Sequence, residues 1–294
     1  MSTPLRIGLL RLADSLPVLM ARELGLFEQA GITAEIVVEP SWANIADGLS
    51  WGRLDAAVVF PPLAIMTYLG KRGRPTPMRV VANLSYGGNT IVLRNGALTT
   101  KAEPRLAVVH AHSTHFLLLR HFLLTHCPAA LDQLVIMPPD RMLDALANGT
   151  IDGFCAGPPW GAAAEDARLG HIVSGSVTIR PGHLEKQFVV TETWTERYPD
   201  QAVKLESILA ASITRCLDPA KQKAITDVLT RPLVDGGFAL PSQAVRTTMP
   251  GSDYPHNFEL TPRHGTSIDW IIAEMRTLGW ISPEEQLRPW TASY

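Results

Sequence analysis

The chain carries little charge and lacks any long apolar run. Charged residues make up 18% of the 294 positions, the formal net charge is -2 and the pI is near 6.5. This balance offers no general attraction to phosphate backbones or anionic lipids, so we expect no direct binding of nucleic acid and no membrane partner. No apolar stretch approaches the roughly 18 residues that a membrane helix needs. Any bound anion must therefore be held by local groups.

Cysteines are also few, and we expect no secretory leader. The chain has three cysteines, Cys127, Cys155 and Cys216. Their odd number and wide spacing favour a reducing compartment over a disulfide framework. Near the N-terminus, Arg11 and Asp14 interrupt any apolar region that a signal peptide would require. We therefore expect a cytoplasmic protein.

One segment of the chain occurs twice. Residues 47–62 are repeated 97 positions later by residues 144–159, and about one match in 16 is expected by chance. The shared residues are Asp47 and Asp144, Leu49 and Leu146, Gly52 and Gly149, Asp55 and Asp152, and the proline pairs 61–62 and 158–159. Each copy has the pattern of an amphipathic helix that stops at glycine and is followed by a short buried strand. The repeat predicts two similar α/β lobes with a ligand cleft at the carboxyl ends of their strands.

Strand-like and helix-like segments alternate through about the first two thirds of the chain, and the remainder is mostly helical. The glycine pair 87–88 predicts a first crossing between lobes, and the apolar residues 188–190 predict a return crossing. Two crossings imply a hinge. We therefore predict an α/β fold with one lobe of residues 1–87 and 190–294 and a second lobe of residues 88–189.

Short motifs between about residues 7 and 200 resemble a known family. They are residues 39–45, 52–57, 88–89, 113–115, 138–142, 151–155, 159–160 and 185–186. The chain resembles the nitrate- and bicarbonate-binding (NrtA/CmpA-like) receptors of ABC importers, which have the two-lobe type II periplasmic-binding-protein fold. Its resemblance is greatest to their leaderless cytosolic relatives, the NasS-type nitrate/nitrite sensors. Departures at residues 58–60, 110–112 and 157–161 line the expected cleft and leave the identity of the anion open.

The resemblance implies a small-oxyanion site. On matching positions it implies Trp42, Asn89, His115, Gly157 and Lys186 as ligand-binding residues. Ser113 and Thr114, at the start of a predicted helix, add backbone donors to this set, and Pro158 and Trp160 are expected on the cleft wall. Nitrate is planar, carries one delocalised charge and only accepts hydrogen bonds, so its pocket needs converging donors and a compensating cation. The indole, amide and ring N–H groups, together with the start of a helix at Ser113, would supply donors, and Lys186 would supply the charge.

The resemblance also implies how such a protein would act. In the NasS-type sensors, the ligand-free form sequesters an RNA-binding ANTAR antiterminator of the NasT type. Binding of nitrate or nitrite releases this partner and permits expression of nitrate-assimilation genes. We expect neither a cofactor nor catalysis.

Other interpretations stay open at this point. The chain could be the substrate-binding receptor of an ABC importer for nitrate or a related anion. His110, His112 and His115, with Cys155, could instead hold a metal or serve a small enzyme, although no complete metal or nucleophile motif accompanies them. Each proposed ligand residue also has an ordinary structural reading, with Trp42 as core, Asn89 as a turn residue and Lys186 as a solvated surface residue.

Overall fold

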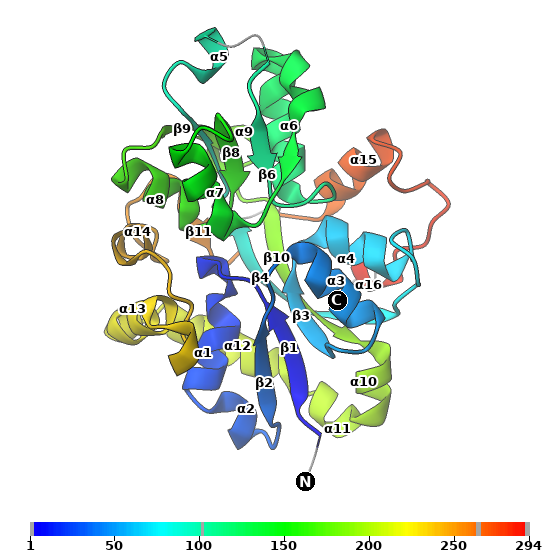
Figure 1. Ribbon diagram of the computed structural model, residues 1–294. Helices are drawn as coiled ribbons and strands as arrows, with labels where there is room; N and C mark the ends of the chain where they lie inside the picture. Colours follow the sequence, from blue (N-terminus) through cyan, green and yellow to red (C-terminus); the bar gives the residue numbers. More distant parts are fainter. Residues whose placement is uncertain (1–2, 101–102, 263–265, 292–294) are drawn as a thin grey trace.

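The computed structural model describes residues 3–100, 103–262 and 266–291, which form two α/β lobes (Figure 1). The first lobe is built on a six-stranded sheet and the second lobe on a five-stranded sheet. Every strand of the second sheet comes from residues 90–175, whereas the first sheet takes strands from before and after that range. The residue boundaries that we predicted for the lobes stay a prediction.

The first sheet combines parallel and antiparallel strands. In spatial order it contains β11 (Phe258–Glu259), β4 (Met78–Gly87), β10 (Leu184–Thr191), β3 (Ala56–Val59), β1 (Leu5–Leu9) and β2 (Ala34–Val38). β1 pairs in parallel with β2 and β3, and β10 pairs antiparallel with β3 and β4. β1 and β3 are nearly continuous apolar runs, which is typical of strands covered on both faces.

The second sheet, like the first, contains a group of neighbouring parallel strands, and it has five strands in place of six. Its spatial order is β7 (Val135–Ile136), β6 (Leu106–Val108), β8 (Gly153–Ala156), β5 (Thr90–Leu93) and β9 (His171–Gly175). β6 pairs in parallel with β7 and β8, and β5 pairs antiparallel with β8 and β9.

Helices cover the faces of both sheets (Figure 1). Those before the second sheet are η1 (Ala13–Ser15), α1 (Leu16–Glu23), α2 (Leu26–Gln29), α3 (Trp42–Ser50) and α4 (Pro61–Tyr68). Those within its span are α5 (Ala97–Thr100), α6 (Thr114–His126), η2 (Pro128–Gln133), α7 (Pro139–Ala147) and α8 (Trp160–Asp166), followed by α9 (Ser176–Ile179). The last part of the chain contributes α10 (Glu192–Arg197), α11 (Pro199–Ala202), α12 (Leu205–Cys216), η3 (Pro219–Lys221), α13 (Gln222–Thr230), η4 (Leu233–Asp235), α14 (Ser242–Thr247), α15 (Asp269–Thr277) and α16 (Arg288–Thr291).

The sequence repeat corresponds to a structural repeat. In each copy a helix, α3 or α7, is followed by a glycine with positive φ and then by a central strand, β3 or β8. The φ angles are 69° at Gly52 and 79° at Gly149. The carboxylates of Asp55 and Asp152 then accept backbone N–H bonds at the start of the neighbouring strands β1 and β6, both at 3.0 Å. In each lobe, the same hydrogen bond between an aspartate side chain and a backbone N–H therefore connects two adjacent parallel strands.

The connections between the lobes occur at β4 and β10. The first passes through Gly87 and Gly88, and a Cβ atom on Gly88 would lie only 2.5 Å from the Cβ atom of Phe258. The return connection comes before Leu184, because β10 joins the first sheet from that residue onward. The apolar run at residues 188–190 is therefore the interior of β10 rather than the crossing. The first half of β10 is polar in sequence. Although it is buried, it does not show the pattern of a strand.

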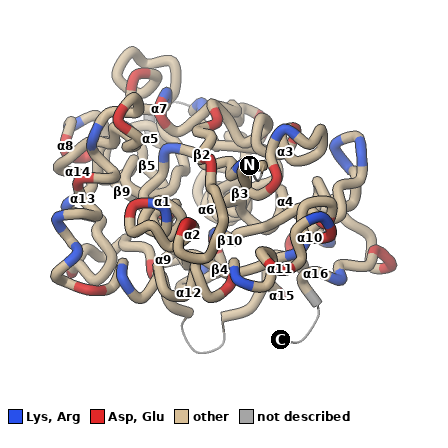
Figure 2. Tube along the Cα trace, turned by 90° about the horizontal axis from the view of Figure 1, so that it is seen from below, with Lys and Arg blue, Asp and Glu red and all other residues tan. Residues whose placement is uncertain are grey.

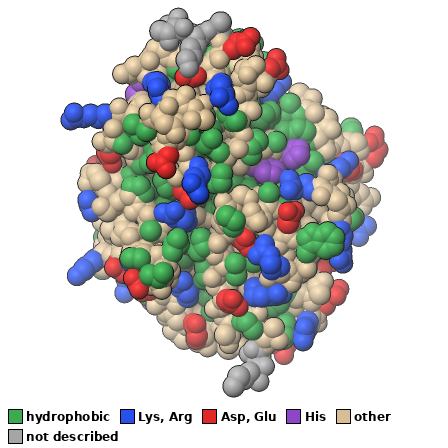
Figure 3. Space-filling view, viewed as in Figure 1, with side chains coloured by type: hydrophobic (Ala, Val, Ile, Leu, Met, Phe, Trp, Pro, Cys, Tyr) green, Lys and Arg blue, Asp and Glu red, His purple; other side chains and the backbone are tan. Residues whose placement is uncertain are grey.

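Both signs of charge are dispersed over the chain, as the tube trace in Figure 2 shows. The face of the molecule in Figure 3 likewise carries interspersed acidic and basic side chains. No helix among the described residues combines the length and apolar character required to cross a membrane.

A buried polar site between the two lobes

Three of the implied ligand residues are brought together by elements of both lobes. Trp42 begins α3, where the Oγ atom of Ser41 caps the helix by accepting the Asn44 N–H at 3.3 Å. His115 lies in the first turn of α6, whose cap Ser113 accepts the Phe116 N–H at 3.0 Å. Lys186 lies on β10, and all three side chains are at most 1% exposed.

Lys186 is the centre of this cluster. Its Nζ atom lies 2.6 Å from Oε1 of Glu185 and 3.0 Å from Oδ2 of Asp14. The same ammonium group lies 5.4 Å from the ring centroid of Trp42 and 5.7 Å from that of Phe60, within the range of cation–π attraction. The lysine therefore points into the protein beside Trp42, and not into bulk water.

The protonation states follow from burial and these contacts. Burial lowers the pKa of Lys186, but Asp14 and Glu185 more than offset this and raise it. Burial also opposes ionisation of Glu185, yet Lys186 and the neighbouring histidines lower its pKa to about 2. Burial lowers the pKa of His115 to about 3 and raises the pKa of Asp14. At neutral pH the cluster thus holds a charged Lys186–Glu185 pair, a neutral His115 and an Asp14 that is shifted toward its protonated form.

Several buried polar atoms of the proposed ligand residues have no hydrogen-bond partner within the described residues. They are the indole Nε1 of Trp42, both ring nitrogens of His115, Oδ1 of Asn89 and Oγ1 of Thr114. Buried polar groups are normally paired, and each one left unpaired costs about 1–3 kcal/mol. The indole N–H and a neutral imidazole both have a donor to offer to an acceptor.

Among the remaining proposed residues, Asn89 and Gly157 contact this cluster, whereas Ser113 stabilises the start of α6. The amide Nδ2 of Asn89 donates to Oε2 of Glu185 at 2.7 Å. A Cβ atom on Gly157 would lie 3.4 Å from Oδ1 of Asn89 and 3.5 Å from Nε2 of His115, so the glycine keeps that space open. Ser113 is occupied, because it caps α6 and its Oγ also donates to the carbonyl of His110 at 2.7 Å.

Pro158 and Trp160 hold the second lobe to the first. The carbonyl of Pro158 accepts the Ala13 N–H at 2.9 Å, and Nε1 of Trp160 donates to the carbonyl of Arg11 at 3.2 Å. Both residues therefore contact the segment that follows β1. Their place on the wall of a ligand cleft stays a prediction.

Sequence reasoning missed Asp14 and His183 as members of the site, whereas it had placed Phe60 in the expected cleft without giving it a contact. Asp14 lies in η1 and is fully buried, and His183 lies 3.7 Å from Oε2 of Glu185. The Phe60 ring packs 4.5 Å from that of Trp42 and 5.7 Å from that of His115. The available signal for Asp14 was a charged residue in the segment that follows the first core strand, at the edge where parallel sheets bind ligands.

The geometry gives little support to a metal centre or an enzyme at the histidine cluster. Within residues 3–100, 103–262 and 266–291, no group of three or more His, Cys, Asp or Glu side chains is placed to hold a metal. His110 instead contacts Arg72 at 2.9 Å, and burial lowers its pKa to about 3. Burial raises the pKa of the Cys155 thiol, which leaves it a poor nucleophile.

Solved structures share the fold of this chain. The periplasmic nitrate-binding protein NrtA from Synechocystis PCC 6803 matches with a TM-score of 0.86, covering 96% of this chain and 83% of that one at 20% identity. The alkanesulfonate-binding protein SsuA from Xanthomonas axonopodis, bound to MOPS, matches with a TM-score of 0.69, covering 94% and 91% of the two chains at 15% identity. The chain therefore has the two-lobe fold of the periplasmic binding proteins, as predicted.

The particular family follows from sequence comparison. Residues 1–230 match the model of the NMT1-like family, and the chain belongs to that family. The nitrate import ATP-binding protein NrtC of Synechocystis is 32% identical over 248 residues, which are 78% of this chain and 37% of NrtC. The nitrate/nitrite binding protein NrtA of Synechococcus elongatus is 29% identical over 243 residues, which are 73% of this chain and 55% of NrtA.

These relatives confirm the resemblance to nitrate- and bicarbonate-binding receptors. The chain spans between about a third and just over half of the length of these curated relatives. Its greater likeness to the NasS-type sensors stays a prediction, as do the ligand contacts of the individual site residues.

Proposed function

We propose that this protein is a receptor that closes around nitrate, nitrite or a similar small oxyanion. The observation that carries the proposal is the set of buried, unpartnered polar groups around Lys186, above all the Trp42 indole N–H and the His115 ring. These groups offer donors to a ligand that can only accept hydrogen bonds. The relatives named as nitrate-binding proteins support the choice of anion.

The proposed contacts come from both lobes, so the anion joins them. Trp42 and Lys186 belong to the first sheet and its helices, whereas His115, Thr114 and Gly157 belong to the second sheet and its helices. Nitrate has four heavy atoms, and a ceiling of about 1.5 kcal/mol for each gives roughly -6 kcal/mol, or tens of micromolar. Closure that excludes water would strengthen the charge-assisted bonds.

The lysine charge is not freely available to this anion. Glu185 and Asp14 both lie within 3.0 Å of Nζ, so an incoming anion competes with two carboxylates. A proton on Asp14 removes one of them and leaves the Lys186–Glu185 pair neutral overall. We therefore propose that the anion is bound with Asp14 protonated, which agrees with the raised pKa of this buried group.

We further propose that the receptor acts as a cytosolic sensor and not as an enzyme. In this proposal the ligand-free form holds an ANTAR antiterminator of the NasT type, and anion binding releases it. The physical requirement is that the partner prefers one hinge state and the anion prefers the other, because a ligand with equal affinity for both states shifts nothing. The motif resemblance to the NasS-type sensors supports this assignment.

A second candidate is the substrate-binding receptor of an ABC importer. The names of the relatives favour it, because they include import ATP-binding proteins and a nitrate/nitrite binding protein. Both candidates share the anion site, and they differ only in the protein partner.

Calorimetric titration with nitrate, nitrite and bicarbonate tests the anion site. Trp42→Phe keeps an aromatic ring but removes the indole N–H, so we expect nitrate affinity to fall about 10- to 100-fold, the value of a hydrogen bond to a charged group. Trp51→Phe is the matched control, because Trp51 is 74% exposed and lies outside the site. Equal nitrate affinity in the wild type and in Trp42→Phe would remove Trp42 from the site, and no heat with any of the three anions would refute the receptor proposal.

Gel filtration with a purified NasT-type antiterminator separates the sensor from the importer receptor. The sensor predicts a complex without anion that dissociates when nitrate is added. Nitrate binding without any such complex would leave the receptor standing and refute the sensor.

A further inference from the structure

Two histidines that follow β6, His110 and His112, have no role in the proposed anion site. His110 contacts Arg72, which lies in the turn after α4 of the first lobe. One terminal nitrogen of the guanidinium group lies 2.9 Å from Nε2 of His110. The other lies 3.7 Å from Oδ1 of Asp47, beyond hydrogen-bond distance. A basic side chain of one lobe thus faces a histidine of the other lobe.

His110 has too few lone pairs for its contacts. Its Nδ1 lies 3.0 Å from the backbone N–H of His112, and its Nε2 faces the Arg72 guanidinium, which can only donate. Burial and the nearby Arg72 lower the pKa of His110 to about 3, so the ring is neutral at neutral pH. A neutral imidazole has one N–H and one acceptor nitrogen, so it accepts from only one of these two donors.

The freedom of the two donors decides which contact lacks an acceptor. The short backbone segment between the two histidines holds the His112 N–H against the ring, whereas the Arg72 side chain is 25% exposed and can turn toward water. Nδ1 of His110 is therefore the acceptor, and Nε2 carries the proton. This buried Nε2–H and the guanidinium then face each other as two donors, and neither is satisfied by the other.

The ring of His112 adds a further unsatisfied group. Its Nδ1 is buried and has no hydrogen-bond partner within the described residues. After burial, the charge of Arg72 is the second cause that lowers the pKa of His112, which places this charge close to both histidines. Trp280 packs edge-on against the His112 ring, with the centroids 4.8 Å apart. Donors from both lobes thus converge on one spot that lacks an acceptor.

Phe60 separates this group from the buried polar site. Its ring centroid lies 6.3 Å from that of His110 and 5.7 Å from that of His115. His115 is fully buried and His110 is 6% exposed, whereas the Arg72 side chain is 25% exposed. The group therefore lies between the buried site and solvent.

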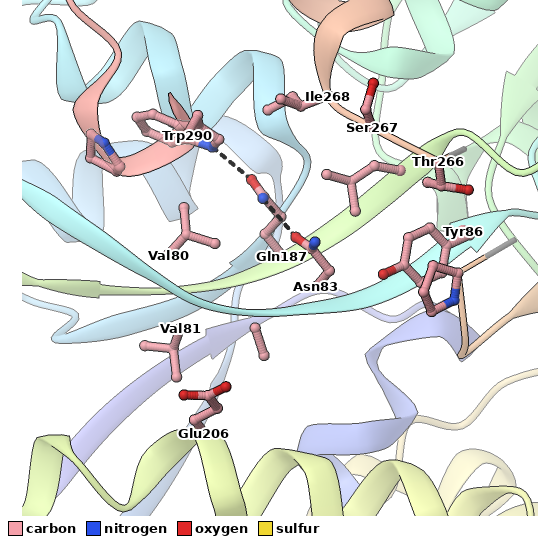
Figure 4. A pocket seen from close by; sticks show the side chains of 14 residues that line it. Val80, Val81, Asn83, Tyr86, Gln187, Glu206, Thr266, Ser267, Ile268 and Trp290 are labelled. Carbon is pink, nitrogen blue, oxygen red and sulfur yellow. Dashed lines mark hydrogen bonds between the residues drawn. The ribbon is translucent and has the colours of Figure 1, made fainter. Parts of the chain in front are cut away.

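The groove beside β4 offers no comparable set of donors. Figure 4 shows this groove, which has a volume of about 360 Å³. Its polar groups bond to one another, because Nε1 of Trp290 donates to Gln187 at 2.8 Å and Nε2 of Gln187 donates to Asn83 at 2.8 Å. Among the described residues that line it, Glu206 is the one charged side chain, and its charge is negative. An anion is therefore disfavoured there.

We propose that Arg72, His110 and His112 form an outer subsite for a small monovalent oxyanion such as nitrate. The anion accepts from the guanidinium and from Nε2–H of His110, and so resolves the contact between two donors. One cation beside two neutral rings matches a single negative charge. The choice of ligand rests on the proposed function, whereas the subsite itself rests on these donors. Because water competes for the exposed guanidinium, we expect affinity in the millimolar range.

NMR of protein with nitrogen-15 in its histidine and tryptophan side chains separates the two sites during titration with sodium nitrate. The ring nitrogens of His110 report the outer subsite, and the indole Nε1 of Trp42 reports the buried site. Loss of a signal in His110→Gln or in Trp42→Phe assigns it. We expect the proton of His110 on Nε2, and we expect this signal to shift between about 1 and 50 mM nitrate.

Arg72→Gln removes the guanidinium, and Arg74→Gln is the matched control, because Arg74 is exposed and lies two residues further along the same loop. The nitrate concentration at half of the His110 shift should rise at least about tenfold in Arg72→Gln and change less than about twofold in Arg74→Gln.

Three results would overturn the subsite: a proton on Nδ1 of His110, equal effects of the two arginine variants, or a Trp42 shift without any His110 shift. A His110 shift that depends on Arg72, without any Trp42 shift, would support the subsite and count against nitrate at the buried site.

Discussion

At the scale of single residues, one buried lysine and its two carboxylates define the candidate site. The motifs predicted Trp42, His115 and Lys186, and the structure brings these three side chains into one buried cluster. Asp14 was not predicted, because its contact with Lys186 joins segments far apart in the chain. Burial of a lysine is costly, so its presence here requires these partners.

Asp14 should make anion binding dependent on pH. An ionised Asp14 about 4 Å from a bound anion would repel it by about 4 kcal/mol at an effective dielectric constant near 20. Since the anion favours protonated Asp14, binding takes up a proton, and nitrate affinity should rise as pH falls through the range in which Asp14 titrates. The limit is tenfold per pH unit for one proton. Calorimetry in buffers of different ionisation enthalpy measures this uptake.

Asp14→Asn should bind nitrate more tightly than the wild type at pH 8 and should lose most of the pH dependence. Asp47→Asn, on the exposed side of α3, should leave both properties unchanged. A steep pH dependence that persists in Asp14→Asn would assign the titrating group elsewhere.

At the scale of helices and strands, the repeat was the most informative feature of the sequence. It predicted two helix–glycine–strand units, and the structure contains both, because the glycine stop and the apolar strand are local signals. The extent of β10 and the existence of β11 were not predicted. β10 begins with buried polar residues that serve the site, and β11 has two residues, too few for any periodicity.

Substitutions at Gly52 test how this glycine ends α3 in the first copy of the repeat. A Cβ atom on Gly52 would have no heavy atom within 4 Å, so only its φ of 69° opposes substitution. Gly52→Ala should therefore lower the free energy of unfolding by about 1 kcal/mol, the cost of a left-handed conformation. Gly52→Asn should cost less, because asparagine adopts this conformation more readily. Urea unfolding measures both, and equal losses would show that the cost is not conformational.

At the scale of the whole molecule, the two lobes are held together around the site. The largest cluster of buried apolar side chains contains residues of both lobes, such as Phe60 from the first and Trp160 from the second. Backbone contacts at Ala13 and Arg11 add to it. The sequence indicated two crossings and thus a hinge, but not these contacts, because they depend on how the lobes meet.

An ion pair at the rim of the cleft should contribute to closure. Arg11, which follows β1, lies 3.2 Å from Asp140 in the first turn of α7. Both side chains are partly exposed, so the pair should contribute about 0.2–1 kcal/mol. Asp140→Asn should therefore weaken nitrate binding by at most about fivefold, mainly through faster dissociation, because the variant favours the open state.

Asp144→Asn, on the same helix but solvent-exposed, is the control and should bind nitrate like the wild type. Small-angle scattering provides the second measurement. Nitrate should reduce the radius of gyration of the wild type, and Asp140→Asn should need a higher nitrate concentration for the same reduction. If the radius does not change with nitrate while calorimetry records binding, the anion binds without hinge closure, and a partner that distinguishes hinge states could not report it.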